Sequence, residues 1–318
     1  MLLNTYEPWK FAFSQEETDF NNLKEGAWGI IGVPFDSTTS YHPGSRFGPI
    51  VVREASYGFE KYNTIFNTQL DNIFYDFGDV NVVFGNCKKT CEIIEDTVNE
   101  LSDLKIKPLT IGGEHSLTIG VLNSLTKKYN NLTVVHLDAH RDLADTFIGE
   151  PYSHASVMKR VHEMGVKELV QIGIRSASKE EEDFVKNQSN ITTFKNNDVF
   201  HHLDNIEYYL STIDTPIYLS IDMDVFDPSI APTVGNPTPN GIAYGHIEAM
   251  LQTLSLKNVV GMDVVETAGD RLGDITAVYA SKIIYDFLSS EISVISIFGL
   301  LKSNIPGPPY WDNYFHWG

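Results

Sequence analysis

The sequence contains few cysteines and few basic residues. Cys87 and Cys91 are the only cysteines in 318 residues, and they stand four positions apart. This helical spacing favours two free thiols over a disulfide or half of a zinc site. Lysine and arginine number 23 against 42 acidic residues, and the net charge of −19 opposes binding to nucleic acid or anionic lipid. A cationic ligand is favoured instead, although ordinary solubility explains the same acidic excess.

The sequence also lacks long hydrophobic runs. Its longest apolar stretches, near residues 28–33 and 292–301, are shorter than the roughly 20 residues that span a bilayer. Residues 1–10 lack a basic region followed by an apolar segment, which a secretion signal requires. There is no Gly/Ser-rich linker and no internal repeat. We therefore expect one domain over residues 1–318, a cytoplasmic location, and no membrane partner.

Short apolar runs rich in β-branched residues recur along the chain and predict strands. They lie at residues 28–33, 73–75, 107–111, 132–137, 169–174, 217–221, 259–265 and 292–298. Segments with helical length and periodicity lie between them, at residues 47–62, 90–104, 118–129, 154–164, 244–256 and 274–288. Strands that alternate with helices predict an α/β fold with a mostly parallel sheet.

Possible metal ligands stand at every second position where two of these runs end. Asp138, His140 and Asp142 follow one run, and Asp222 and Asp224 follow another. In an extended chain this spacing points the side chains of each set to one side. So many carboxylates together would repel one another and raise their own pKa values unless a positive charge held them. A pair of divalent cations is the simplest such charge.

Ligands of open parallel sheets bind beyond the carboxyl ends of the strands. Two further predicted strands end in polar residues, at positions 110–116 and 262–266. In the first, Gly112 and Gly113 allow a tight turn that brings His115 to the site. Alone, this segment is typical of a plain turn, but beside the other motifs His115 becomes a candidate ligand. Four strand ends therefore predict one site.

Other polar residues near these motifs have simpler interpretations. Asp227 breaks the two-residue period and is interpreted as a turn residue or as an acceptor that orients a ligand. His136 lies deeper in its strand and is interpreted as a hydrogen-bonded core histidine. The remaining histidines outside the motifs are interpreted as structural or surface residues: His42, His162, His201, His202, His246 and His316.

Two imidazoles among four carboxylates form an oxygen-rich ligand set without thiolate. Such a set suits Mn²⁺ better than Zn²⁺, although ligand type does not fix the metal. Four carboxylates balance the charge of two divalent cations. Between two such cations the pKa of a water molecule falls toward about 7. The implied reaction is metal-assisted hydrolysis.

Three of these motifs together resemble the ureohydrolases, the family of arginases, agmatinases, formiminoglutamases and related guanidino hydrolases. The motifs occupy residues 112–116 (GGEHS), 138–142 (DAHRD) and 220–228 (SIDMDVFDP), in the family's order. The similarity extends from residues 32–36 and 44–49 through 76–80 to Glu266 and 273–276, and covers nearly the whole chain. The resemblance implies a three-layer α/β/α fold of the arginase/deacetylase type and is strongest to agmatinases.

The resemblance also implies a ligand set for two Mn²⁺ ions. One ion would be held by His115, Asp138, Asp142 and Asp222, and the other by Asp138, His140, Asp222 and Asp224. Asp138 and Asp222 would bridge the two ions.

Three catalytic roles follow from the same resemblance. His154 would carry a proton to the leaving amine, with a plain helix-start histidine as the alternative. Glu266 would pair with the substrate guanidinium, with a structural strand-end carboxylate as the alternative. Asp142 would accept a hydrogen bond from the attacking hydroxide and orient it. The products would be urea and a primary amine.

Departures from the arginase pattern favour agmatine, which would yield putrescine and urea. Arginases carry an asparagine where this sequence has Ala144, and residues 153–155 resemble agmatinases. Agmatine is dicationic and suits an acidic entrance, where Asp145, Glu150 or Asp270 would receive its distal amine. N1-aminopropylagmatine, guanidinobutyrate and arginine stay open as substrates.

Two other functions are alternatives to this interpretation. A catalytically silent homologue would be expected to lose His154 or Glu266, and both are present. A two-metal phosphoesterase needs cationic groups to clamp phosphate, and Arg141 is the only nearby candidate. Family members are commonly trimers or hexamers, so a homo-oligomer is expected, while the sequence leaves its size open.

Overall fold

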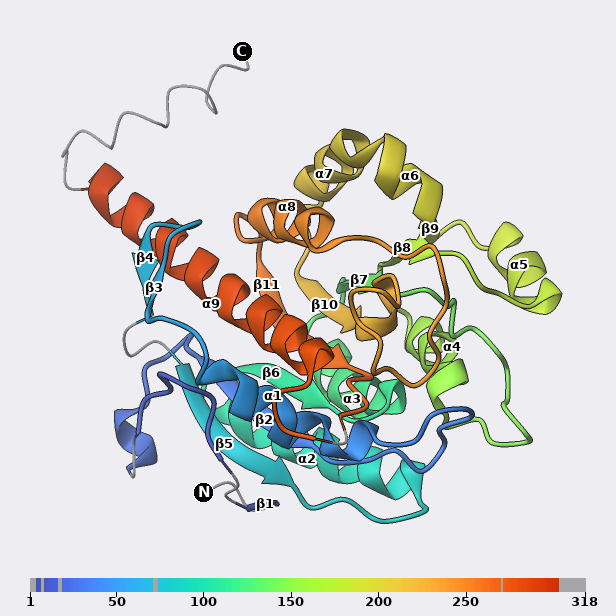
Figure 1. Cartoon of the computed structure of the whole chain (residues 1–318), viewed down its shortest axis with the longest axis horizontal. Coiled ribbons are helices and arrows are strands. Elements are labelled where there is room, and N and C mark those ends of the chain that lie inside the picture. The colour runs from blue at the N-terminus through green and yellow to red at the C-terminus, as the bar shows by residue number, and fades with distance from the viewer. Residues whose placement is uncertain (1–3, 7–8, 17–18, 71–73, 270, 303–318) are drawn as a thin grey trace.

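A β-sheet lies at the centre of the chain, with helices on both of its faces (Figure 1). The computed structural model describes residues 4–6, 9–16, 19–70, 74–269 and 271–302, of which 292–302 by backbone alone. The strands of the central sheet are β1 Thr5–Tyr6, β2 Trp28–Val33, β5 Phe74–Val80, β6 Lys107–Gly112, β7 Thr133–Leu137, β8 Glu168–Ile174, β9 Ile191–Lys195, β10 Ile217–Asp222 and β11 Val259–Val265. A separate hairpin is formed by β3 Tyr62–Asn63 and β4 Thr68–Gln69.

The helices alternate with these strands. The α-helices are α1 Gly48–Ser56, α2 Cys87–Asp103, α3 Thr118–Lys128, α4 Val157–Glu163, α5 Lys179–Lys186, α6 Asn196–His201, α7 Leu203–Thr212, α8 Tyr244–Leu254 and α9 Ile275–Lys302. Five 3₁₀ turns accompany them: η1 Phe20–Asn22, η2 Ser45–Phe47, η3 His115–Leu117, η4 His154–Ser156 and η5 Met223–Val225. Among the described residues, none of the helices combines the length and apolarity that crossing a bilayer requires.

The central sheet has the strand order β1-β5-β2-β6-β11-β10-β7-β8-β9. All neighbouring strands are parallel except the short β1, which pairs antiparallel with β5. The prediction of a mostly parallel α/β sheet is therefore confirmed. Its central strands are buried along their whole length, because helices cover both faces of the sheet and shield the side chains that point to either face.

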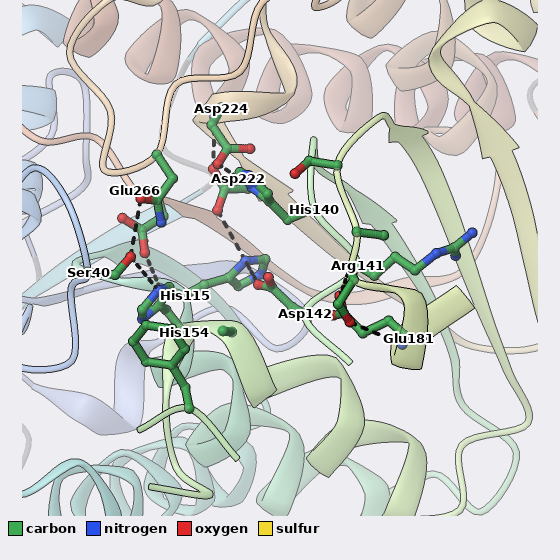
Figure 2. Close-up of a pocket in the computed structure, with 16 residues that line it drawn as sticks. Ser40, His115, His140, Arg141, Asp142, His154, Glu181, Asp222, Asp224 and Glu266 are labelled. Atoms are coloured by element: carbon green, nitrogen blue, oxygen red, sulfur yellow. Dashed lines mark hydrogen bonds and ion pairs between the residues drawn. The ribbon is translucent and has the colours of Figure 1, made fainter. Parts of the chain in front are cut away.

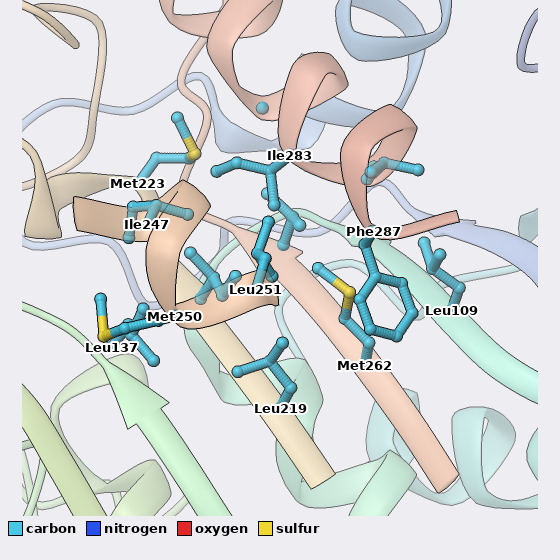
Figure 3. Close-up of a cluster of buried hydrophobic side chains, with 14 of the residues drawn as sticks. Leu109, Leu137, Leu219, Met223, Ile247, Met250, Leu251, Met262, Ile283 and Phe287 are labelled. Atoms are coloured by element: carbon cyan, nitrogen blue, oxygen red, sulfur yellow. The ribbon is translucent and has the colours of Figure 1, made fainter. Parts of the chain in front are cut away.

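Two apolar cores fill the spaces between the sheet and the helices. One lies under α1, α7, α8 and α9, where Leu219 and Met262 of the sheet meet Leu251, Ile283 and Phe287 of the helices (Figure 3). The other lies under α2, α3 and α4. Sheet and helices thus form three layers, α/β/α, as the resemblance implied.

Some predicted elements differ from the structure. Residues 292–298, predicted as a strand, continue helix α9, because a short apolar run has no periodicity that separates a buried strand from a buried helix. The predicted helix at 47–62 ends at Ser56, shortly before Gly58, since glycine disfavours helix continuation. Strand β9 and helices α5 to α7 were not predicted. The cysteines are free, as expected, with their sulfur atoms 3.9 Å apart.

Candidate active site

Strands β6, β11, β10 and β7 are neighbours at the centre of the sheet. Because they are parallel, their carboxyl ends lie along one edge, and the polar residues that follow them meet there. His115 follows β6, Asp138 follows β7, Asp222 ends β10 and Glu266 follows β11. The structure thereby brings all the predicted site residues of four separate segments into one region.

One group of possible ligands surrounds the ring of His115. Its Nδ1 lies 3.2 Å from an oxygen of each of Asp138, Asp142 and Asp222. All four residues are buried. The Nδ1 atom nevertheless has no hydrogen-bond partner among the described residues. Three carboxylates and one imidazole nitrogen that face a single point form a donor set suited to a cation.

A second group surrounds the ring of His140. Its Nδ1 lies 2.9 Å from an oxygen of Asp224 and 3.5 Å from an oxygen of Asp138. Asp138 therefore belongs to both groups, through its two different oxygens. This arrangement fits the bridging role that the resemblance implies for Asp138.

The backbone reaches these positions by a route that the sequence did not indicate. Strand β7 ends at Leu137, so the three residues predicted to alternate on an extended strand lie in the loop beyond it. Asp142 has a left-handed backbone with φ 54°, and Asp224 lies in turn η5. The three side chains meet as predicted, but a loop and not an extended strand brings them together. Left-handed non-glycine residues are uncommon and often mark functional sites.

Burial and mutual repulsion raise the pKa values of two of these carboxylates. Burial, and then the charge of Asp138, raises the pKa of Asp142 to about 6. Burial, and then repulsion from Asp224 and Asp138, raises the pKa of Asp222 well above its ordinary value. Divalent cations among these groups would favour the ionised forms and reverse both shifts. The residues present therefore fit a pair of metal ions.

A hydrogen-bond chain fixes the orientation of the His115 ring. Ser220 donates its hydroxyl proton to Asp263 at 2.7 Å, and its oxygen lies 2.9 Å from Nε2 of His115. Since the hydroxyl has only one proton, Nε2–H of His115 donates to Ser220. The neutral ring therefore carries its proton on Nε2 and keeps Nδ1 for a cation. Asp263 itself also accepts from Thr118 and Tyr218, so it belongs to the support of the site.

His136 lies closer to the metal groups than its position in strand β7 suggested. Its Nε2 lies 2.8 Å from Asp138, and Gln171 donates to its Nδ1 at 3.2 Å. Both ring nitrogens are thus occupied, which confirms the prediction of a hydrogen-bonded core histidine. Its effect is to hold the Asp138 carboxylate.

Glu266 lies deep in the site and also has a left-handed backbone, with φ 63°. Its carboxylate accepts the backbone N–H of His115 at 2.8 Å and the hydroxyl of Ser45 at 2.9 Å. Burial, and then the charge of Glu114, raises its pKa to about 8. A guanidinium beside it would supply the missing opposite charge and favour the ionised form.

His154 starts turn η4 and lies beside Ser40 (Figure 2). Its Nδ1 lies 3.2 Å from the hydroxyl oxygen of Thr38, and its Nε2 lies 3.2 Å from that of Ser40. Burial, and then the charges of His115 and His140, lowers its pKa to about 4. The ring is therefore neutral near pH 7 and able to accept a proton.

Glu266, His154 and all of the candidate metal ligands except Asp138 line one cavity of about 200 Å³ (Figure 2). It shares Ser40 and Phe147 with a larger neighbouring cavity of about 570 Å³, which we call the outer cavity. Segments 37–40, 85–88 and 147–153 contribute the residues that line the outer cavity.

Comparison with known proteins agrees with this geometry. Residues 27–289 match the family model described as the arginase family. The chain belongs to the arginase family. Its fold is similar to that of the agmatine ureohydrolase of Thermoplasma volcanium, with a TM-score of 0.81 and 28% identity over 94% of this chain and 98% of that one.

Two relatives are similar to this arginase-family chain over almost their full lengths. An uncharacterised 32.2 kDa protein of Methanothermus fervidus is 43% identical, covering 88% of this chain and 97% of that one. The N(1)-aminopropylagmatine ureohydrolase of Thermococcus kodakarensis is 37% identical, covering 89% and 96%. The protein is therefore a hydrolase of the family that acts on guanidino groups.

Arg141, the cation that a phosphoesterase would need, is already engaged. Its guanidinium donates to Glu182 at 2.9 Å, Gln171 at 2.9 Å and Thr193 at 3.1 Å. Asp227 accepts from Ser229 and from Gly241, in agreement with its interpretation as a turn residue. The site thus lacks a free phosphate clamp among the described residues that line it.

The sequence did not single out every residue that organises the site. Thr38, Ser40 and Ser45 come from the loops after β2 and contact His154 or Glu266. Glu114 is fully buried and accepts from Thr38 and Ser116. The one available signal was the position of Glu114, an acidic residue directly before a candidate ligand in a tight turn.

Proposed function

We propose that this protein hydrolyses the guanidino group of agmatine, releasing urea and putrescine, with two Mn²⁺ ions bound. The observation that carries the proposal is that five of the six candidate ligands, all but Asp138, line the same cavity as Glu266 and His154. A buried carboxylate and an acid–base histidine in one cavity are what a planar cation and its leaving amine require. A cytoplasmic location and a homo-oligomeric assembly stay predictions from the sequence.

The six ligand side chains would be divided as the resemblance implies. His115, Asp138, Asp142 and Asp222 would hold one ion, and Asp138, His140, Asp222 and Asp224 the other. When bound, the two ions would supply an acidified water for attack on the guanidinium carbon.

The chain's own residues would do the rest of the chemistry. Glu266 would pair with the guanidinium and hold its plane, because its carboxylate is fixed by Ser45 and by the backbone of His115. Asp142 would orient the attacking water by accepting its hydrogen bond. His154, neutral at pH 7, would take up a proton at Nε2 and return it to the leaving amine.

The distal amine of agmatine would lie in the outer cavity. Of the three carboxylates considered from the sequence, Asp145 pairs with Arg160 at 3.3 Å and lines neither cavity. Asp270 lies outside the described residues. Glu150 lines the outer cavity, so it is the carboxylate that would receive the amine.

A guanidino acid is the second candidate substrate, favoured by a cation in the lining of the outer cavity. Lys88 lines this cavity, together with Cys87, the first residue of helix α2 after its cap Asn86. A lysine and a helix N-terminus attract a carboxylate. The outer cavity thus offers one carboxylate and one cation for the non-reacting end of the substrate.

Urea release by purified, Mn²⁺-loaded protein tests the proposal. Agmatine, N1-aminopropylagmatine, 4-guanidinobutyrate and arginine form the panel, and agmatine is expected to give the highest kcat/KM. Glu150→Gln should raise the KM for agmatine by about tenfold, a loss of roughly 1.4 kcal/mol of binding. Lys88→Gln is the matched control and should leave that KM unchanged. If Lys88→Gln instead impairs turnover of 4-guanidinobutyrate, the guanidino acid is the substrate.

A further inference from the structure

A hydrogen-bond chain runs from His154 through Thr38 to Glu114, the buried residue that directly precedes His115. Thr38 donates its hydroxyl proton to Oε1 of Glu114 at 2.6 Å and its backbone N–H to Oε2 at 2.7 Å. The same hydroxyl oxygen lies 3.2 Å from Nδ1 of His154 and accepts the backbone N–H of His154 at 3.1 Å. We propose that Thr38 and Glu114 are positioning residues that fix the tautomer of His154. The inference rests on the proposed proton transfer by His154.

The direction of each hydrogen bond in the chain follows from counting protons. A threonine hydroxyl has one proton to donate and two lone pairs that accept. The carboxylate of Glu114 also accepts the hydroxyl of Ser116 at 2.5 Å, so its oxygens serve as acceptors for three donors. The single proton of Thr38 is committed to Glu114. Both lone pairs of Thr38 then accept from His154, one from its backbone and one from Nδ1–H.

This assignment places the proton of neutral His154 on Nδ1 and leaves Nε2 free. Nε2 lies 3.2 Å from the hydroxyl of Ser40, which also has the amide oxygen of Asn236 as an acceptor at 3.3 Å; with the ring proton on Nδ1, the Ser40 hydroxyl donates to Nε2 instead of Asn236, and both Ser40 and Asn236 line the cavity. Nε2 is therefore the atom that takes up and returns the proton. Since Nδ1–H donates to Thr38 in the neutral and the charged ring alike, His154 needs no rotation between the two steps. The tautomer is thus preset for the reaction.

Variants of Thr38 test the role of its hydroxyl separately from the role of its shape. Thr38→Val keeps the shape but removes the acceptor of Nδ1–H, and we expect kcat to fall by about tenfold to a hundredfold with KM little changed. Such a loss is part of the roughly 10²–10⁴-fold that a positioned acid–base group contributes. Thr38→Ser should restore kcat to within about twofold. Ser281→Ala is the control, because the hydroxyl of Ser281 in helix α9 is also buried without a hydrogen-bond partner among the described residues and lines neither cavity.

Glu114→Gln makes a sharper prediction, because an amide can donate. The backbone N–H of Thr38 cannot reverse, so the glutamine oxygen must take the place of Oε2 and its NH₂ the place of Oε1. The hydroxyl of Thr38 then accepts from that NH₂ and turns its own proton toward Nδ1 of His154. The neutral ring must move its proton to Nε2. A residue with only a structural role would cause no such switch.

Imidazole ¹⁵N NMR spectra read the tautomer directly and do not depend on turnover. The protein is labelled at its 10 histidines and loaded with diamagnetic Mg²⁺, and the signals of His154 are assigned as those missing from His154→Asn. We expect Nδ1–H in the wild type and in Thr38→Ser, and Nε2–H in Glu114→Gln. An Nε2–H tautomer in the wild type, or an unchanged kcat in Thr38→Val, would overturn the proposal.

The two kinds of failure are distinguishable. A wild-type protein that releases no urea from any compound of the panel refutes the proposed function, while the spectra still decide the tautomer. If the wild type is active and has the Nδ1–H tautomer, equal kcat values for Thr38→Val and Ser281→Ala contradict the positioning role alone. Metal content, measured by elemental analysis, should be the same in all of these variants.

Discussion

Replacing Ser220 with alanine is expected to weaken metal binding while the fold persists. Ser220 is fully buried and accepts Nε2–H of His115, so alanine leaves that donor without a partner. A buried unsatisfied donor costs about 1–3 kcal/mol, which corresponds to roughly 5- to 150-fold in an equilibrium constant. This cost weakens metal binding. Without Ser220, the His115 ring is no longer kept in the tautomer with its proton on Nε2, nor in the orientation that points Nδ1 toward Asp138 and Asp222. Loss of the partner that orients a ligating histidine typically lowers metal affinity by about 10- to 100-fold.

Competition with a chelator of known Mn²⁺ affinity measures this loss. Tyr218→Phe is the matched control, because the Tyr218 hydroxyl donates to the same carboxylate of Asp263 at 2.5 Å but does not contact His115. Both variants remove one donor from Asp263, so they should destabilise the metal-free protein to a similar degree. Only Ser220→Ala should lose Mn²⁺ affinity. Equal Mn²⁺ affinities in the two variants would refute the reasoning.

Three further perturbations have defined outcomes. His154→Ala should slow urea release yet retain both metal ions, whereas Asp138→Asn should reduce metal content; equal metal loss in elemental analysis would contradict this division of roles. Arg53→Met leaves two buried carboxylate partners unpaired and should lower the free energy of unfolding by about 3–5 kcal/mol in urea denaturation, while a loss below about 1 kcal/mol would exclude a structural ion pair. Hydrogen bonds from Ser229 lower the pKa of Asp227 to about 2, below its ordinary 3.8. The resulting stabilisation is complete above pH 4 and is lost as the pH falls through 2, so wild type and Asp227→Asn should converge in stability toward pH 2.

The central part of the fold could be predicted because its strands are buried on both sides. Segments rich in valine and isoleucine, such as Val259–Val265, are buried along their whole length and are separated by segments with helical periodicity. Strand β9 escaped prediction because Ile191–Lys195 lies at the edge of the sheet, where its side chains are only partly buried and alternate weakly. The segment 292–298 was assigned wrongly because its apolar residues fit a strand and a helix equally well.

The gathering of the candidate ligand residues could be predicted because they follow buried strands, where charged groups require compensation. Their backbone geometry could not, since the left-handed conformations of Asp142 and Glu266 depend on contacts from distant segments. Thr38 and Ser40 lie in a loop without periodicity, and their role can be recognised only from the contacts of their hydroxyls with His154. Local sequence patterns therefore identify charged candidate ligands, whereas neutral residues that position other side chains are recognised only in the tertiary structure.

The division of the site among four strands has a consequence for folding. His115 and Asp222 lie 3.2 Å apart although 222 − 115 = 107 positions separate them along the chain, so the candidate metal centre exists only after the middle of the sheet has assembled. Nucleating such long-range contacts is slow, and a cation has nothing preformed to bind before that stage. Added Mn²⁺ should therefore retard unfolding without accelerating refolding. In a denaturant chevron, the metal would shift only the unfolding limb.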